Sequence, residues 1–256
     1  MIYTFPDTNF NLSQIANSGQ CFRWEWVDTG YNHYYEVPIY NYTSKVFTEA
    51  NEILVDTEAP KVLVDNYFDI DTDYIQIIDE VPANDAFLKQ AAEKFSGLRI
   101  LRQPLWETII SFIISQNNNI PRIKKSIKAI CDQNNGNFPL FLDMVEGKVD
   151  LSKCNLGYRQ EYIENIVDSP WILPFGSDYQ DAMKFYQKFK GVGPKVANCI
   201  CLYSLHYLEA CPIDTWIKKI IDKRYGGQTP DWVYSEYAGV YQQYCFCYER
   251  YLERKL

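Results

Sequence analysis

The chain has 256 residues, of which 47% are hydrophobic, and its formal net charge is −8 at pH 7. This length suits one large domain or two modest ones with packed cores. A dense apolar run at residues 108–114 is too short to cross a membrane, and the first residues lack the pattern of a secretion signal. Eight cysteines in a chain of this length do not indicate a secreted disulfide scaffold. We therefore expect a cytosolic protein with no membrane partner.

The charged residues are unevenly distributed along the chain. Acidic residues crowd the stretch 49–80, whereas basic residues gather at 122–125, 184–195 and 218–224. A negative net charge argues against a nucleic-acid partner, because duplex affinity comes largely from neutralised phosphates. A local basic face on an acidic protein is nevertheless compatible with DNA binding. A charged run by itself more often marks a solvated helix face.

The first part of the chain has the pattern of β-strands. Large apolar and polar residues alternate over 21–27 and, less regularly, over 34–40. Asp28-Thr29-Gly30 between them is typical of a turn. We therefore predict mainly strands as far as about Asp79.

Beyond Asp79 the pattern becomes helical. A helix is expected to open after Asp85, and the apolar density of 106–114 predicts a buried helix. The predicted fold class is α+β, with an N-terminal antiparallel β-sheet domain at residues 1–80. A mostly α-helical domain at residues 81–256 is expected to follow it.

Two polar segments within the helical part have plain structural explanations. Three asparagines at 117–119 follow the buried helix, and a capped turn accounts for them. Farther on, Tyr158 suits a core position and Arg159 suits a surface charge. These residue types by themselves do not specify a site.

The segment 189–201 predicts a helix, a glycine hairpin and a second helix. Gly191 ends the apolar helical pattern before it, and Gly191 and Gly193 are both able to adopt positive φ. Pro194 suits the first position of the new helix, and Lys195 follows in its first turn. The exposed N–H groups at such a helix start suit a phosphate oxygen. An ordinary helix–turn–helix corner has the same pattern.

Asp214 occupies the N-cap position of the next predicted helix, ahead of isoleucines at helical spacing. Capping alone would explain this aspartate. A lysine at one helix start and an aspartate at the next are also able to converge on one cleft. In the C-terminal helix, Gln242 and Phe246 share a face at i, i+4, as Lys195 and Cys199 do in theirs.

Residues 191–199 followed by 212–214 resemble the hairpin, lysine and aspartate of the helix-hairpin-helix DNA glycosylases. Within that superfamily the chain is most similar to the 8-oxoguanine DNA glycosylase/AP lyase branch, and the resemblance spans roughly the whole sequence. It implies that Lys195 is the nucleophile that attacks the deoxyribose and forms a Schiff base. It also implies that Asp214 stabilises the cationic sugar, and that β-elimination then nicks the strand.

The resemblance implies a pocket for the flipped, oxidised base. The segment 18–24 resembles a signature in which a glycine, here Gly19, offers its carbonyl to N7–H of 8-oxoguanine. Cys199 and Phe246 match the residues on the two faces of the base. Gln242 matches the residue that bonds its pyrimidine edge.

The resemblance also implies the DNA contacts. Asn117 matches the residue that fills the gap left by the extruded base, and Tyr158 matches an intercalating wedge. Arg122 and Arg159 match the residues that read the orphaned cytosine. The hairpin glycines, Gly191 and Gly193, let the DNA backbone approach closely.

One departure and several alternatives stay open. Trp216 stands where this branch usually has a phosphate-binding histidine, so the resemblance does not extend to that contact. One alternative is a glycosylase for other oxidised or alkylated bases. Lys195 argues against the monofunctional alkylation enzymes, which lack this lysine. The other alternative is a non-catalytic DNA-binding hairpin module. The expected partner is double-stranded DNA with an oxidised guanine, bound by a monomer without cofactor, metal or iron–sulfur cluster. The expected location is the cytoplasm, in association with the nucleoid if the protein is bacterial, or the nucleus.

Overall fold

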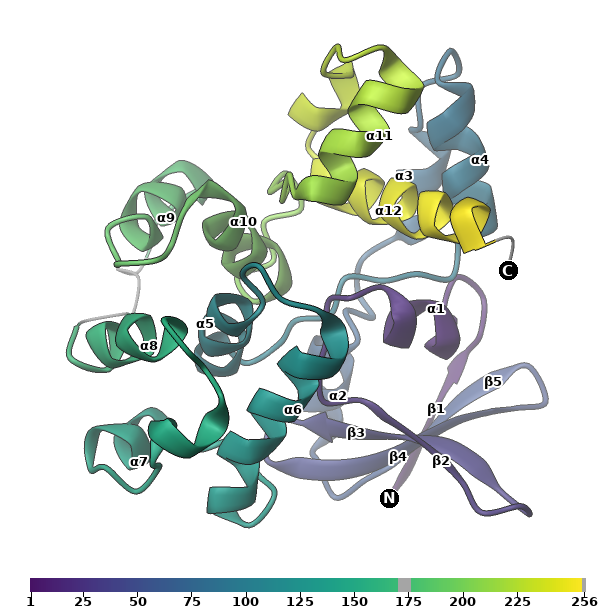
Figure 1. Cartoon of the computed structure of the whole chain (residues 1–256). Coiled ribbons are helices and arrows are strands. Elements are labelled where there is room, and N and C mark those ends of the chain that lie inside the picture. The colour runs from purple at the N-terminus through teal and green to yellow at the C-terminus, as the bar shows by residue number, and fades with distance from the viewer. Residues whose placement is uncertain (170–175, 255–256) are drawn as a thin grey trace.

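The computed structural model describes residues 1–169 and 176–254. A twisted antiparallel sheet forms one end of the molecule, and helices form the rest (Figure 1). The predicted α+β class, with a β-sheet first and helices after it, is confirmed. The division at residue 80 stays a prediction.

The sheet has five strands in the order β1-β5-β4-β3-β2, and each neighbouring pair is antiparallel. The strand predicted at 34–40 is present as β3. The strand predicted at 21–27 is wrong in its first half, because Phe22 and Trp24 leave the sheet and are buried in two different hydrophobic clusters. The strands are β1 (Ile2–Pro6), β2 (Glu25–Asp28), β3 (His33–Ile39), β4 (Tyr42–Glu49) and β5 (Glu52–Asp56).

Three short helices interrupt the part of the chain that was expected to be mainly strands. They are too short for a period of 3.6 residues to stand out in the sequence. Asn11 and Asp73 cap two of them, since their side chains accept the N–H groups of Gln14 and Ile75. The helices are α1 (Leu12–Asn17), α2 (Lys61–Tyr67) and α3 (Tyr74–Asp79).

One hydrophobic cluster belongs to the sheet. Val46 and Val55 pair across neighbouring strands and are fully buried, together with Val37. Ile15 of α1 and Val64 of α2 belong to the same cluster. Burial of each such side chain contributes about 1.5–3 kcal/mol, so the sheet and these helices form one packed body.

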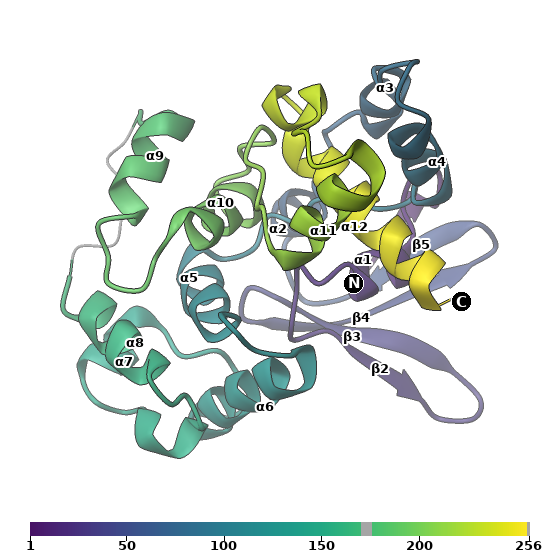
Figure 2. The ribbon, with the colours of Figure 1, turned by 45° about the horizontal axis from the view of Figure 1, so that its top comes forward.

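The second cluster belongs to the helices, and α5 lies beside α10, α6 and α8 (Figure 2). The helix predicted at 106–114 is α5, and the one predicted to open after Asp85 is α4, whose Leu88 N–H meets Asp85 Oδ1 at 2.9 Å. α5 packs against α10, and α12 packs against α4 and α11. The helices are α4 (Ala86–Lys94), α5 (Leu105–Ile114), α6 (Ile120–Cys131), α7 (Phe141–Val145), α8 (Arg159–Val167), α9 (Tyr179–Tyr186), α10 (Pro194–Tyr203), α11 (Thr215–Tyr225) and α12 (Ala238–Arg254).

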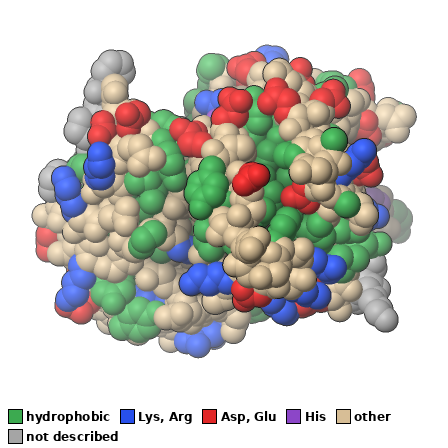
Figure 3. Space-filling model, turned by 90° about the horizontal axis from the view of Figure 1, so that it is seen from above, with side chains coloured by type: hydrophobic (Ala, Val, Ile, Leu, Met, Phe, Trp, Pro, Cys, Tyr) green, Lys and Arg blue, Asp and Glu red, His purple; other side chains and the backbone are tan. Residues whose placement is uncertain are grey.

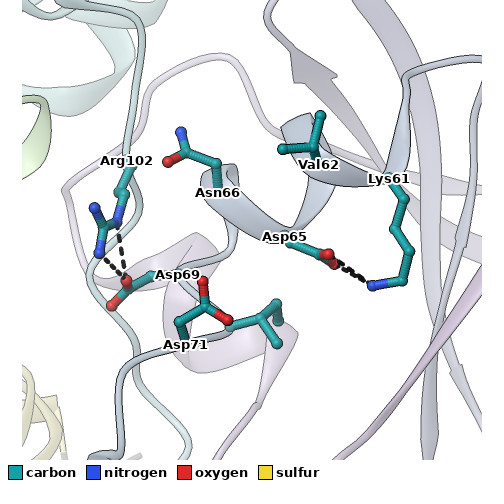
Figure 4. Close-up of a pocket in the computed structure, with 8 residues that line it drawn as sticks. Lys61, Val62, Asp65, Asn66, Asp69, Asp71 and Arg102 are labelled. Atoms are coloured by element: carbon teal, nitrogen blue, oxygen red, sulfur yellow. Dashed lines mark hydrogen bonds and ion pairs between the residues drawn. The ribbon is translucent and has the colours of Figure 1, made fainter.

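A buried aspartate ties the two clusters together. The Asp69 carboxylate lies 2.9 Å from both Arg102 and His206 Nε2 and accepts the Tyr74 hydroxyl at 2.8 Å. Burial raises the pKa of Asp69, but the hydrogen bond and charge of His206, the Thr72 hydroxyl and Arg102 outweigh it and lower the pKa to about 2. Arg102 and Asp69 form one end of a polar hollow on the surface (Figure 4). Because these partners come from both parts of the chain, the ion pairs hold the sheet against the helices.

Candidate active site

The glycine hairpin joins α9 to α10. The helix predicted to continue to Phe189 ends earlier, at Tyr186, and a tight turn carries the chain to Pro194. Gly191 has φ +85°, whereas Gly193 has φ −86°, so only the first of the two glycines uses the positive-φ region. A Cβ at Gly193 would meet no atom within 4 Å. The backbone of the hairpin is therefore open to an approaching ligand at Gly193.

Lys195 lies in the first turn of α10 and is half-buried. Its Nζ lies 3.4 Å from Ser115 Oγ, at the end of α5, and 5.3 Å from the centre of the Phe112 ring. Phe112 in turn stacks on Tyr203, with the ring centres 5.2 Å apart. The lysine amine is thus held at the edge of the core by groups from α5, instead of extending into solvent.

Cys199 lies one turn after Lys195 and is buried. Burial raises the pKa of its thiol to about 11, and the nearby Lys195, which hydrogen-bonds to it, only partly opposes this effect. Cys199 therefore stays a neutral thiol, which suits an apolar wall beside the lysine.

Asp214 caps α11, since its Oδ1 accepts the Ile217 N–H at 2.9 Å. The predicted capping position is confirmed. The negative charge of Asp214 also acts to raise the pKa of the Cys199 thiol. The carboxylate thus caps a helix and lies within electrostatic reach of Cys199.

Gly19 faces the C-terminal helix. It has φ +80°, and a Cβ at this position would lie 3.7 Å from Cε1 of Phe246. Gln20 anchors the loop, because its buried amide donates to the carbonyl of Arg99 at 2.9 Å and accepts the Leu101 N–H at 2.8 Å. The end of α1 accordingly lies beside α12 (Figure 1), and Arg250 donates to the carbonyl of Asn17 at 3.0 Å. The structure thus joins two predicted pocket residues from opposite ends of the chain.

Trp216 packs against Phe246. The two rings meet edge to face, with centroids 6.2 Å apart. The guanidinium of Arg250 lies 5.2 Å from the centre of the Phe246 ring. Trp216 thus supports a wall of the predicted pocket from the position where the resembled branch has histidine.

Gln242 is buried in α12 beside Gln243, which donates its Nε2 to Gln242 Oε1 at 3.2 Å. The Gln243 amide also donates to the hydroxyl of Tyr203. The predicted base-edge residue is therefore part of a hydrogen-bonded group that reaches to the end of α10.

The predicted DNA contacts lie in a second group. Asn117 is exposed, has φ +46°, and its amide donates to the Tyr158 hydroxyl at 3.4 Å. Arg159 is buried, and its guanidinium donates to the carbonyls of Gln116 and Asn117. Arg122 is exposed at the start of α6. The structure brings Asn117, Tyr158 and Arg159 together, but Arg159 is turned inward instead of toward a base.

Seen from above, the molecule exposes hydrophobic side chains around its middle, with Lys, Arg, Asp and Glu side chains distributed around them (Figure 3). Within the described residues, no helix is long and apolar enough to span a membrane. No group of three or more His, Cys, Asp or Glu side chains in the same part of the chain is placed to hold a metal.

Several neighbours of the site were not found by sequence reasoning. Phe112, Ser115 and Tyr203 have the spacing of ordinary core residues, and Gln243 has no motif that distinguishes it. A glutamine inside an apolar helical pattern is the one signal that would have drawn attention to Gln243, because a buried amide needs hydrogen-bond partners.

A hairpin that leads into a lysine-bearing helix, with an aspartate at the next helix start, is typical of the helix-hairpin-helix DNA glycosylases. Residues 2–109 match the family model of the 8-oxoguanine DNA glycosylase N-terminal domain. An N-glycosylase/DNA lyase from Saccharomyces cerevisiae is 31% identical over 84% of this chain and 68% of its own length. An N-glycosylase/DNA lyase from Arabidopsis thaliana is 31% identical over 62% of this chain and 54% of its own.

The solved structures agree with these sequence relatives. The Clostridium acetobutylicum 8-oxoguanine glycosylase/lyase, in complex with double-stranded DNA containing cytosine opposite 8-oxoguanine, has a TM-score of 0.86 and 30% identity. The match covers 100% of this chain and 99% of that one. A 3-methyladenine DNA-glycosylase from Archaeoglobus fulgidus, at 16% identity and a TM-score of 0.74, shares the fold. The chain belongs to the 8-oxoguanine DNA glycosylase family.

Proposed function

We propose that this chain is a bifunctional DNA glycosylase/AP lyase that excises 8-oxoguanine opposite cytosine and nicks the strand. The position of Lys195 carries the proposal: its amine is half-buried at the start of α10, against Phe112, Ser115 and Cys199. Membership of the 8-oxoguanine DNA glycosylase family supports it.

Lys195 performs the first chemical step as a neutral amine. Its lone pair forms a bond to C1′ of the deoxyribose, and the bond from C1′ to the base breaks, with the electron pair leaving on the base, which takes up a proton. The Asp214 carboxylate stabilises the positive charge that develops on the sugar. Opening of the sugar gives a Schiff base, and loss of a proton from C2′ then expels the 3′ phosphate.

The lesion has to leave the duplex to reach the lysine. Cys199 and Phe246 contact its two faces, and Gln242 bonds its pyrimidine edge. The carbonyl of Gly19 accepts N7–H of 8-oxoguanine, whereas N7 of guanine has no proton and repels it. One backbone carbonyl therefore distinguishes the oxidised base from the normal one.

The DNA is held by the hairpin and by the Asn117 group. The backbone at Gly191 and Gly193 approaches the phosphates, and Asn117 and Tyr158 enter the duplex beside the flipped base. Arg122 and Arg159 read the opposite cytosine. To do so, Arg159 gives up its hydrogen bonds to the carbonyls of Gln116 and Asn117 and donates to the base. The enzyme acts as a monomer without a cofactor, in the compartment that holds the DNA.

The test is one incubation of the protein with a duplex containing 8-oxoguanine opposite cytosine, in the presence of borohydride. The expected results are a covalent complex, free 8-oxoguanine and a nicked strand. Lys195→Gln should bind the duplex but give none of these products, while Lys45→Gln, an exposed lysine on β4, should behave as the parent. Excision without trapping would remove the lyase assignment, and binding without excision would favour a non-catalytic module.

A further inference from the structure

Gln243 occupies an unusual position next to the base-edge residue. Its side chain is buried in α12, and its Nε2 donates to both the Tyr203 hydroxyl and Oε1 of Gln242. A glutamine amide has two N–H donors, so both donors of Gln243 are used. Among the described residues its Oε1 has no hydrogen-bond partner.

Tyr203 makes this arrangement rigid. It is buried at the end of α10 and stacks on Phe112, with an angle of 15° between the ring planes. Its carbonyl accepts the N–H of Gln103 at 2.8 Å. Burial raises the pKa of the Tyr203 hydroxyl well above its ordinary value, so the group stays neutral. Gln243 is therefore held by a fixed hydroxyl on one side and touches Gln242 on the other.

The contact decides which way the Gln242 amide points. Oε1 of Gln242 accepts from Gln243, so reversal of the amide would place the two NH2 groups against each other. Two donors that face each other in a buried site leave both unpaired, which is costly. Gln242 consequently offers its carbonyl and its NH2 at set positions instead of exchanging them.

A set orientation matters because purine edges differ in the order of their polar groups. Guanine and 8-oxoguanine present an acceptor at position 6 and a donor at N1, whereas adenine and 8-oxoadenine present a donor at position 6 and an acceptor at N1. An amide that turns freely pairs with either order. An amide with one orientation pairs with only one of them.

We propose that Gln243 is a specificity-determining, positioning residue that fixes the amide of Gln242 and so lets the enzyme distinguish 8-oxoguanine from 8-oxoadenine. The inference rests on the proposed function, in which Gln242 meets the edge of the flipped base. Both lesions carry N7–H and an oxygen at C8, so the Gly19 carbonyl and the two pocket faces do not separate them. Discrimination between the two falls on Gln242.

The test compares excision of 8-oxoguanine and 8-oxoadenine, each opposite cytosine, under single-turnover conditions. Gln243→Met keeps the length of the side chain and removes both donors and the unpaired acceptor. The ratio of the two excision rates should fall about tenfold, since a good base contact discriminates by about that factor. Nicking of a duplex with an abasic site, which has no base to read, should be unchanged. Gln76→Met, an exposed glutamine on α3, serves as the matched control.

A double substitution shows whether Gln243 acts through Gln242. In a Gln242→Ala background, Gln243→Met should not change the ratio further. An unchanged ratio in Gln243→Met alone would overturn the inference, as would a parallel loss of both excision rates and of nicking, which marks a structural role.

A binding measurement separates this inference from the proposed reaction. In a Lys195→Gln background, the affinities for duplexes with 8-oxoguanine and with 8-oxoadenine should differ, and Gln243→Met should reduce that difference. A parent that binds selectively but fails to excise would refute the reaction and leave the inference standing. If the two duplexes bind equally well both with Gln243 and with Gln243→Met, the inference is refuted, whether or not the protein excises the base.

Discussion

Gly191 lies so close to Tyr162 that a Cβ added at the glycine would be 2.2 Å from Cδ2 of the tyrosine ring. Gly191 also has φ +85°, which other residues rarely adopt. Gly193, at the start of α10, has neither constraint. The fold itself requires the first glycine of the hairpin, whereas only an external ligand would require the second.

The two glycines should therefore respond differently to alanine. Gly191→Ala should lower the free energy of unfolding by roughly 1–3 kcal/mol, because it combines backbone strain with overpacking against Tyr162. Gly193→Ala should leave the unfolding free energy within about 0.5 kcal/mol of the parent value and weaken DNA binding. Urea unfolding and fluorescence anisotropy with a labelled duplex measure the two effects. Unchanged DNA affinity in Gly193→Ala would show that the backbone there does not meet DNA.

Asp214→Asn separates the capping role from the chemical role. Asparagine caps helices as well as aspartate does, so the unfolding midpoint should hardly change. Excision of 8-oxoguanine should fall on the order of 100-fold, because the carboxylate no longer stabilises the charged sugar. Asp178→Asn is the matched control, since Asp178 caps α9 by accepting the Asp181 N–H at 2.8 Å. A variant that unfolds, or one that turns over at the parent rate, would leave capping as the only role of Asp214.

The two arginines should differ in their effect on stability. Arg159→Ala removes the guanidinium that donates to the carbonyls of Gln116 and Asn117, so the free energy of unfolding should fall by roughly 1–3 kcal/mol. Arg122→Ala removes an exposed side chain and should not change it. Both variants should flatten the preference for cytosine, measured as excision rates opposite each of the four bases. If only Arg122→Ala flattens the preference, Arg159 holds the loop and does not read the base.

Asp69 should make stability depend on pH in the acid range. Its pKa falls from 3.8 to about 2 on folding, so its contribution is complete above the unfolded value and is lost as pH falls through the folded one. The contribution is about 2 kcal/mol. Urea unfolding from pH 6 down to pH 3 should show the gap between the parent and Asp69→Asn narrowing as pH falls. Asp65→Asn, which removes a carboxylate paired with the exposed Lys61, serves as the surface control.

The sequence alone was enough to predict some of the local features of the fold. Helix starts at Asp85, Pro194 and Asp214 follow from cap chemistry and are present in the structure. The buried helix α5 follows from apolar density, and β3 follows from alternation. Each of these depends on neighbours within a few residues, which is the range in which the sequence directly shows the interactions.

Only the tertiary structure decided which residues from distant parts of the chain contact one another. Arg159 has the sequence context of a surface charge, yet it is buried because the carbonyls of Gln116 and Asn117 come within reach of it. Gln243 is separated from Tyr203 along the chain and meets it only when α12 packs near the end of α10. Gly19 likewise meets Phe246 from the opposite end of the chain. Such contacts are set by the packing of whole elements, so the spacing of residues in the sequence does not contain them.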